Sequence, residues 1–156
     1  MTLSIGRRAP KTPSVRTIRY YRIAMKVIGI EFAASEMNYV VVDCGVDNSL
    51  AVTASNRLNL SETRSHEALR AFQQAVKTLL KDVSPDYIAI KTKPEKGSMA
   101  AGPAALKMEA IVLASAPCEV KFISGARINK CVESDSSLKA YHHPAFKAAV
   151  CGCKSE

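Results

Sequence analysis

The chain has 156 residues, 47% of them hydrophobic and 23% charged, which is enough for one domain with a substantial core and excludes a second independent domain. Its net charge of +8 comes mainly from six Lys and Arg residues within the first 24 positions, where no acidic residue stands, and the remaining residues carry only +2. The domain itself is therefore only mildly basic, and no run approaches the roughly 18 apolar residues that would span a membrane.

The first 24 residues are rich in Arg, Ser, Thr and Pro and contain no apolar segment of the roughly 7–15 residues that a secretory signal requires. Their Arg content is typical of a mitochondrial transit peptide, but Pro10 and Pro13 would interrupt the amphipathic helix of such a peptide. We therefore interpret residues 1–24 as a disordered basic leader or a mis-assigned start, and residues 25–156 as the domain.

The five cysteines are an odd number in a chain without an export signal, which predicts reduced thiols and a cytoplasmic location. Cys151 and Cys153 form a C-x-C pair, and no second Cys or His pair stands at zinc-finger spacing. We interpret the cysteines as structural or incidental thiols. Capture of a metal by Cys151, Cys153 and a nearby histidine is the less favoured alternative.

Three strands are predicted at the start of the domain. Residues 26–32 are rich in β-branched side chains, which is typical of a strand buried on both faces, and this strand carries the carboxylate Glu31. Residues 37–44 and 50–54 form the second and third strands, and the brief turns between the three predict an antiparallel meander. Residues 55–63 are polar and are predicted to form a connection.

A helix is predicted after Ser65, a suitable N-cap, because apolar residues recur at spacings of three, four and seven: Leu69, Phe72, Val76, Leu79, Leu80 and Val83. Pro85 follows this helix, and residues 87–90 form a fourth strand. Because the chain returns through a helical crossover, this strand is expected to lie parallel to its neighbour in the sheet.

The second helix is predicted to open at Pro103, with a buried stripe formed by Leu106, Ala110 and Leu113. Glu109 stands three residues after the first member of this stripe and four before the last, so it is expected at the edge of the stripe and partly buried. Truncating Leu113 is therefore expected to destabilise the domain strongly, and truncating Met99, in the preceding loop, is expected to do little.

The last elements are a strand over residues 119–123, a short helix over residues 126–132 capped by Ser124, a polar loop, and a helix over residues 144–150. Phe146, Ala149 and Val150 are predicted to face inward. Gly152 is suited to the C-terminal cap of this helix.

The loop between the fourth strand and the second helix is dense in lysine and glycine. Ligands of open α/β sheets usually bind beyond the carboxyl ends of the strands, and a helix N-terminus favours anions. The predicted ligand-binding residues are therefore Lys91, Lys93, Lys96, Gly97 and Lys107. The alternative is an ordinary solvated loop.

The order β-β-β-α-β-α-β-α predicts an α/β fold of the RNase H-like type, with a mixed five-stranded sheet and helices on both faces. Residues 25–31 and 85–90 resemble the first and fourth strands of RuvC-type Holliday junction resolvases and their YqgF relatives. Residues 96–109 resemble a small, uncharacterised bacterial family of this fold. The resemblance covers about residues 25–151, nearly the whole domain.

The resemblance to resolvases implies a site in which three or four carboxylates, sometimes with a histidine, hold two Mg²⁺ ions. Glu31 stands where these enzymes have an aspartate, Lys91 where they have a glutamate, and Tyr141 and Pro144 where they have acidic residues. A two-metal site is therefore not expected, and no cofactor is expected. The adjacent histidines His142 and His143 are interpreted mainly as a surface pair without function.

Three functions remain open. The first is a non-catalytic domain that binds nucleic acid or another phosphate-bearing ligand. The second is a divergent metal-dependent nuclease using Mg²⁺ or Mn²⁺, with Glu31, Glu109 and His143 as candidate catalytic and metal residues. The third is a structural or partner-binding protein, because a fold does not fix a function. The sequence predicts a mixed cluster at this site, with Glu31 and Glu109 as acids, Lys91, Lys93, Lys96 and Lys107 as bases and His143 at the rim. Pairing of two opposite charges near one strand end for structure alone is an equal alternative to a functional role.

Overall fold

The computed structural model describes residues 23–154, and every structural statement below refers to them. The predicted leader lies outside the described residues except for its last two positions. The first strand, β1, begins at Ile23, so the predicted boundary at Met25 falls inside a strand. No helix among the described residues is long and apolar enough to cross a membrane.

The sheet has five strands in the order β3-β2-β1-β4-β5. β1 pairs antiparallel with β2 and parallel with β4, β2 pairs antiparallel with β3, and β4 pairs parallel with β5. The meander and the parallel return of the fourth strand are thus confirmed. The bounds of the strands are β1 Ile23–Ala33, β2 Glu36–Gly45, β3 Leu50–Asn59, β4 Tyr87–Lys91 and β5 Glu119–Ile123.

The prediction for the third strand is too short. β3 continues to Asn59 through residues that were predicted to form a connection. Residues 53–57 are exposed and mostly polar, so they carry no alternating apolar pattern. Their backbone is held by pairing with β2, in which Asn38 lies opposite Arg57. An edge strand with a solvated face does not need the side-chain signal by which strands are recognised.

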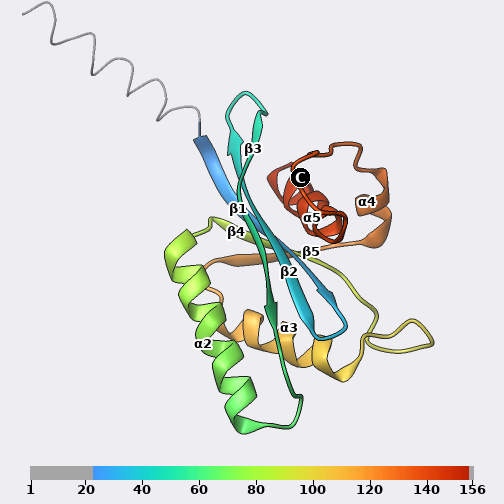
Figure 1. Ribbon diagram of the computed structural model, residues 1–156. Coiled ribbons are helices and arrows are strands. Elements are labelled where there is room, and N and C mark those ends of the chain that lie inside the picture. Colours follow the sequence, from blue (N-terminus) through green and yellow to red (C-terminus); the bar gives the residue numbers. More distant parts are fainter. Residues whose placement is uncertain (1–22, 155–156) are drawn as a thin grey trace, which may run out of the picture.

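The helices cover both faces of the sheet. α2 and α3 lie on one face, and α4 and α5 lie on the other (Figure 1). Ser65 and Ser124 cap α2 and α4 as predicted, because their hydroxyl oxygens accept bonds from the backbone N–H groups of Ala68 and Arg127. The bounds of the helical elements are α2 His66–Val83, α3 Pro103–Ser115, α4 Gly125–Lys130, the 3-10 helix η1 Ala140–His142 and α5 His143–Cys153.

Each face of the sheet has its own core. We call the side covered by α2 and α3 the α2 face, and it buries Ile28, Ile30 and Phe32 of β1. The opposite side, the α5 face, buries Val27 of the same strand beneath α5. Alternation along a strand therefore assigns Gly29 and Glu31 to the α5 face.

The predicted buried stripe of α3 is rotated from the observed one. Ala105, Met108 and Val112 are buried, whereas Leu113 is 43% exposed and Ala110 is exposed. The helix is apolar nearly all round, so the spacing of its apolar residues did not identify the buried side. Glu109 is half-buried, as predicted from its position at the edge of the apolar stripe.

Two predictions for the C-terminal region are wrong. Gly152 does not cap α5 but lies buried inside it, where a Cβ would come within 3.0 Å of the Cβ of Ala89 and 3.2 Å of Cγ1 of Val27. Cys44 and Cys153 are not free thiols but form a disulfide, whereas Cys118, Cys131 and Cys151 are free. The fold brings β2 and the end of α5 together, which cysteine spacing alone does not reveal.

Candidate functional site

The carboxyl ends of β1 and β4 bring Glu31 and Lys91 side by side. Ile30 and Ile90 are register partners, so the next residue of each strand stands at the same edge of the sheet. Lys91 Nζ lies 3.5 Å from Glu31 Oε2, and the side chains are 29% and 14% exposed, respectively. The two charges therefore form a mostly buried ion pair.

α5 runs antiparallel to β1 and begins at this edge. A Cβ on Gly29 would lie 1.9 Å from the carbonyl oxygen of Ala145 and 2.8 Å from the Cβ of Ala149, whereas Gly152 packs on Val27. The helix therefore extends past Gly29 toward Glu31 at its N-terminal end.

Asn38 is a site residue that sequence reasoning missed. It is the register partner of Glu31 in β2, it is only 3% exposed, and its Oδ1 atom has no hydrogen-bond partner among the described residues. Buried polar atoms without a partner are uncommon in folded proteins. The sequence did contain a signal for this buried amide. Asn38 is a polar residue at the start of a strand whose next residues on the same face, Val40 and Val42, are apolar.

The residues of η1, directly before α5, contact β3 near this edge of the sheet. His142 is 4% exposed, so the expectation of a surface histidine pair is wrong for it, and its Nε2 atom lies 3.0 Å from the carbonyl oxygen of Asn56 in β3. The guanidinium of Arg57 lies 4.2 Å from the centre of the Tyr141 ring. Nδ1 of His142 and Nε2 of His143 are buried and have no hydrogen-bond partner among the described residues.

The lysine loop, residues 92–102, is held by its own backbone. The N–H of Thr92 donates to the carbonyl of Ile123 in β5 at 2.9 Å, and the N–H of Ala101 donates to the carbonyl of Pro94 at 2.7 Å. Gly97 has a φ of +92°, which favours glycine at the tip. Lys93 is half-buried and Lys96 is exposed. The loop projects away from the sheet (Figure 1) and presents these lysines in an ordered turn.

Two predicted site residues lie on the other face of the sheet. Lys107 belongs to α3, and its Nζ atom donates to the carbonyl oxygen of Thr63 at 2.6 Å, so it ties α3 to the connection before α2. Glu109 also belongs to α3. Burial raises the pKa of its carboxyl group, and the nearby carboxylate of Glu95 in the lysine loop raises it further. The structure therefore does not gather Lys107 with Lys91.

The candidate metal residues Glu31, Glu109 and His143 come from two faces of the sheet. Within residues 23–154, no three or more His, Cys, Asp or Glu side chains are grouped so that they could hold a metal ion. What the carboxyl edge does assemble is an ion pair, an amide oxygen, a histidine and a helix N-terminus. This arrangement offers polar side-chain atoms beside an ion pair whose two charges compensate each other.

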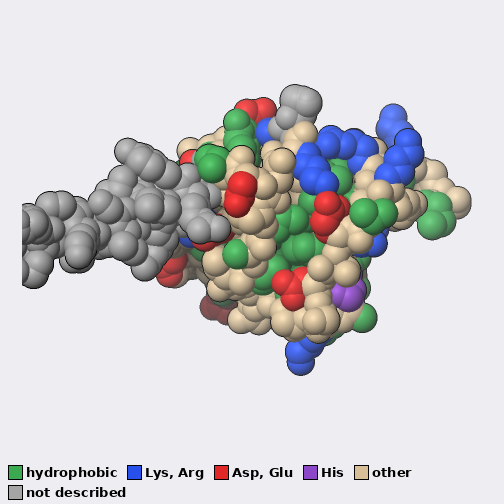
Figure 2. Space-filling view, turned by 90° about the horizontal axis from the view of Figure 1, so that it is seen from above, with side chains coloured by type: hydrophobic (Ala, Val, Ile, Leu, Met, Phe, Trp, Pro, Cys, Tyr) green, Lys and Arg blue, Asp and Glu red, His purple; other side chains and the backbone are tan. Residues whose placement is uncertain are grey.

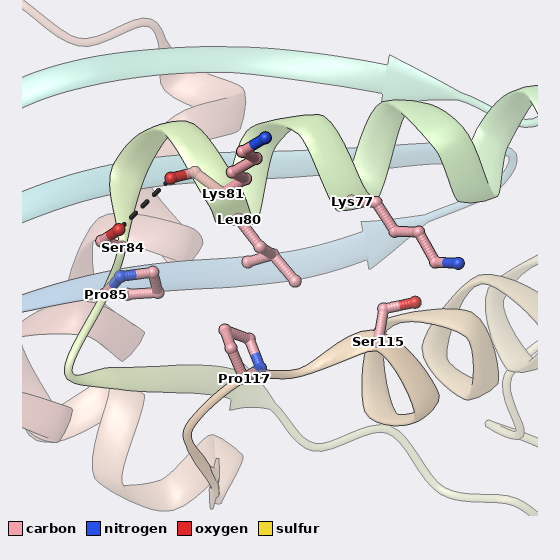
Figure 3. Close-up of a pocket in the computed structure, with 7 residues that line it drawn as sticks. All are labelled: Lys77, Leu80, Lys81, Ser84, Pro85, Ser115 and Pro117. Atoms are coloured by element: carbon pink, nitrogen blue, oxygen red, sulfur yellow. Dashed lines mark hydrogen bonds between the residues drawn. The ribbon is translucent and has the colours of Figure 1, made fainter.

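A pocket of about 470 Å³ lies at the opposite edge, between the C-terminal ends of α2 and α3. Figure 3 shows Lys77 and Leu80 of α2 pointing toward Ser115 and Pro117 across it, whereas the side chain of Lys81 points away. On the face drawn in Figure 2, Lys and Arg side chains gather along one edge and acidic side chains are dispersed. Positive charge is thus present at more than one place on the surface.

A model of the family described as "Protein of unknown function (DUF3010)" matches residues 25–152. No curated protein is significantly similar in sequence.

Several solved structures share the fold. A Thermus thermophilus RuvC structure has a TM-score of 0.65 and 12% sequence identity, covering 81% of this chain and 92% of that one. The T. thermophilus RuvC in complex with Holliday junction substrate has a TM-score of 0.63 and 14% identity, covering 81% and 90%. The yeast mitochondrial Holliday junction resolvase Ydc2 has a TM-score of 0.54 and 11% identity, covering 82% and 77%. These likenesses confirm the predicted RNase H-like fold, which this chain shares with the RuvC and Ydc2 structures.

Proposed function

Because this chain belongs to the DUF3010 family of proteins of unknown function, we propose its function from the carboxyl edge of its sheet: it is a non-catalytic RNase H-like domain that binds nucleic acid through the phosphate backbone. The proposal includes a cytoplasmic location, where nucleic acid is accessible to a bacterial protein.

The ion pair between Glu31 and Lys91 carries the proposal. A two-metal nuclease needs negative ligands where its strands end, and here an ammonium group lies 3.5 Å from the carboxylate oxygen. A cation entering this edge would meet a like charge at a short distance, where the repulsion is strong because both side chains are mostly buried. Metal-dependent cleavage is therefore disfavoured.

The lysine loop supplies the binding surface of the proposal. Lys96 is exposed, Lys93 is half-buried, and the backbone bonds of the loop keep both in place beyond the end of β4. An ordered loop backbone loses little conformational freedom when its lysines contact phosphates. The similarity in fold to the T. thermophilus RuvC in complex with Holliday junction substrate supports nucleic acid as the class of ligand.

A divergent nuclease is the second candidate, favoured by the unpartnered Nε2 of His143 and Oδ1 of Asn38. A histidine nitrogen, an amide oxygen and the Glu31 carboxylate are chemically suitable donors for Mg²⁺ or Mn²⁺. The set does not fit such a metal as it stands, because Lys91 already neutralises the only carboxylate in it.

The test measures binding and cleavage separately, with branched, duplex and single-stranded DNA and RNA in Mg²⁺ and in Mn²⁺. We expect no cleavage, and weak binding that falls as salt rises, because a few lysines release only a few counterions. The double variant Lys93→Ala/Lys96→Ala should lower the slope of log affinity against log salt by roughly two.

The chain offers a matched control in Lys77→Ala/Lys81→Ala, which removes two exposed lysines at the opposite edge. This control should leave the slope unchanged. Equal effects of the two double variants would show that binding is not localised to the lysine loop. Cleavage that disappears in Glu31→Gln would replace the proposal with the nuclease.

A further inference from the structure

Four of the five cysteines converge on the C-terminal end of α5. Cys44, Cys131, Cys151 and Cys153 all pack in or against the core of the α5 face, whereas Cys118 packs against the core of the α2 face. Cys44 at the end of β2 and Cys153 at the end of α5 are joined by a disulfide across 109 residues of sequence. The bond ties the last turn of the helix to the sheet.

We propose that this disulfide is a reversible clamp that opens and closes with the redox state of the surroundings. This inference rests on the cytoplasmic location proposed above, because disulfides in reducing compartments are usually transient and serve redox sensing or catalysis. A bond that is formed only under oxidising conditions would fix α5 on the sheet covalently, whereas in the reduced protein packing alone holds the helix.

The exposure of the two cysteines sets the order of the exchange. Cys44 is 5% exposed, whereas Cys153 is half-buried and reachable. In closing, the Cys153 thiolate attacks a low-molecular-weight disulfide, forms a mixed disulfide and releases one thiol. The Cys44 thiolate then attacks the sulfur of Cys153 and releases the second thiol. One external disulfide is reduced to two thiols, and the two protein thiols are oxidised to one disulfide.

The position of the pair favours a clamp over an oxidoreductase. Catalytic cysteines have a thiolate stabilised by a helix N-terminus or a nearby cation. Cys153 is the last residue of α5, where the carbonyl groups of the helix disfavour a negative charge. The Cys153 thiol therefore lacks the activation that catalytic turnover requires, whereas reversible equilibration with glutathione does not require it.

The clamp bears on the site because one helix connects the two. α5 runs from His143, at the edge that holds Glu31, to Cys153, and between them it packs directly on the backbone of β1 at Gly29. Closing the disulfide fixes the far end of this helix. The first turn of α5 then has fewer ways to move away from the carboxyl edge.

The test equilibrates the full chain in mixtures of reduced and oxidised glutathione, blocks free thiols, and maps the disulfide-linked peptides. Oxidising mixtures should yield the peptide joining Cys44 to Cys153, and dithiothreitol should remove it. The oxidised protein should melt roughly 7–15 °C above the reduced protein, because a disulfide closing a long loop restricts the unfolded chain. Amide exchange in α5 should be slower in the oxidised form.

Cys153→Ser should abolish the difference in melting temperature between the two states, and Cys118→Ser, on the other face, should preserve it. The comparison of oxidised and reduced wild-type protein needs no variant, so it stands even if a variant folds poorly. A linked peptide joining other cysteines would overturn the proposal. So would a Cys44–Cys153 bond that dithiothreitol cannot reduce, or one that leaves amide exchange in α5 unchanged.

Discussion

A lysine–carboxylate ion pair lies near each end of the parallel strands β1 and β4, and the two pairs are closely similar. We call the end where these strands begin the amino edge and the end where they finish the carboxyl edge. Near the amino edge, Lys26 Nζ lies 3.4 Å from Asp43 Oδ1, with side chains 35% and 17% exposed. At the carboxyl edge, Lys91 Nζ lies 3.5 Å from Glu31 Oε2, with side chains 29% and 14% exposed. Distance and burial of the pairs therefore do not distinguish a structural edge from a functional one.

The backbone around the pairs does distinguish the edges. At the amino edge the N–H of Lys26 donates to Oδ2 of Asp86 at 2.8 Å, and the N–H of Asp86 donates to the carbonyl of Lys26 at 2.8 Å, so β1 and the residue before β4 close on each other. At the carboxyl edge the chain leaves β4 for the lysine loop, and Thr92 bonds to β5 instead. The amino edge is closed by its own backbone, whereas the carboxyl edge ends in a loop and a helix N-terminus.

The largest effect is expected from Gly29→Ala, which would disrupt the packing of α5 on β1. A Cβ at this position would lie 1.9 Å from the carbonyl oxygen of Ala145, which is backbone and cannot rotate away, so α5 must shift. We expect a loss of about 3 kcal/mol or more in the free energy of unfolding, measured by urea denaturation.

Gly125→Ala is the matched control, because a Cβ there meets nothing within 4 Å and alanine suits the first turn of α4. This variant should be neutral or slightly stabilising. If the two alanine variants were equally stable, α5 would not pack on β1 as described, and the carboxyl edge would lack its helix.

The next largest effect concerns α3, which carries Glu109 beside the lysine loop. Met108→Ala should cost about 2–5 kcal/mol of unfolding free energy, because the side chain of Met108 is fully buried. Leu113→Ala should cost less than about 1 kcal/mol, because Leu113 is 43% exposed. Thermal or urea unfolding of the two variants decides between the observed stripe and the stripe predicted from spacing, which would make Leu113 the costly position.

The contrast between α2 and α3 shows how much of the fold the sequence contains. α2 has one apolar stripe, and its buried residues Phe72, Val76 and Leu80 were all predicted. α3 is apolar on nearly every side, so only the tertiary contacts select its buried face. The order of elements and the sheet topology were predictable because turns, crossover length and buried strands limit the possible arrangements.

The site was less predictable, because it forms from residues far apart in the chain. Glu31 and Lys91 were predicted as site residues, because each stands at or near the carboxyl end of its strand. Asn38 and the buried state of His142 depend on the pairing of β2 with β1 and on the contact between η1 and β3. The register of β2 against β1 and the placement of η1 are fixed by packing rather than by local pattern.

Replacing either lysine by methionine tests whether the two ion pairs have different roles. Lys26→Met and Lys91→Met each leave a mostly buried carboxylate without its partner, so each should cost about 1–3 kcal/mol of unfolding free energy. Only Lys91→Met should also alter nucleic-acid binding, measured by fluorescence anisotropy at fixed salt. Identical binding by both variants would mean that the Glu31–Lys91 pair serves stability alone.

The smallest expected effect depends on pH and concerns Glu109, whose pKa is raised first by burial and then by Glu95. A carboxyl group with a higher pKa in the folded than in the unfolded state binds its proton more tightly when folded, so its ionisation opposes folding. Above the raised pKa this cost is fully present, and it disappears as the pH falls below the ordinary value of 4.5. Glu109→Gln should therefore raise the melting temperature slightly at pH 7 and leave it unchanged near pH 4.

Glu62→Gln, at an exposed position in the connection before α2, is the control for removing one negative charge from a basic chain. If both variants shifted the melting temperature equally at pH 7, net charge would explain the result. A shift confined to Glu109→Gln would show that ionised Glu109 opposes folding because of its burial, with Glu95 of the lysine loop adding to the effect.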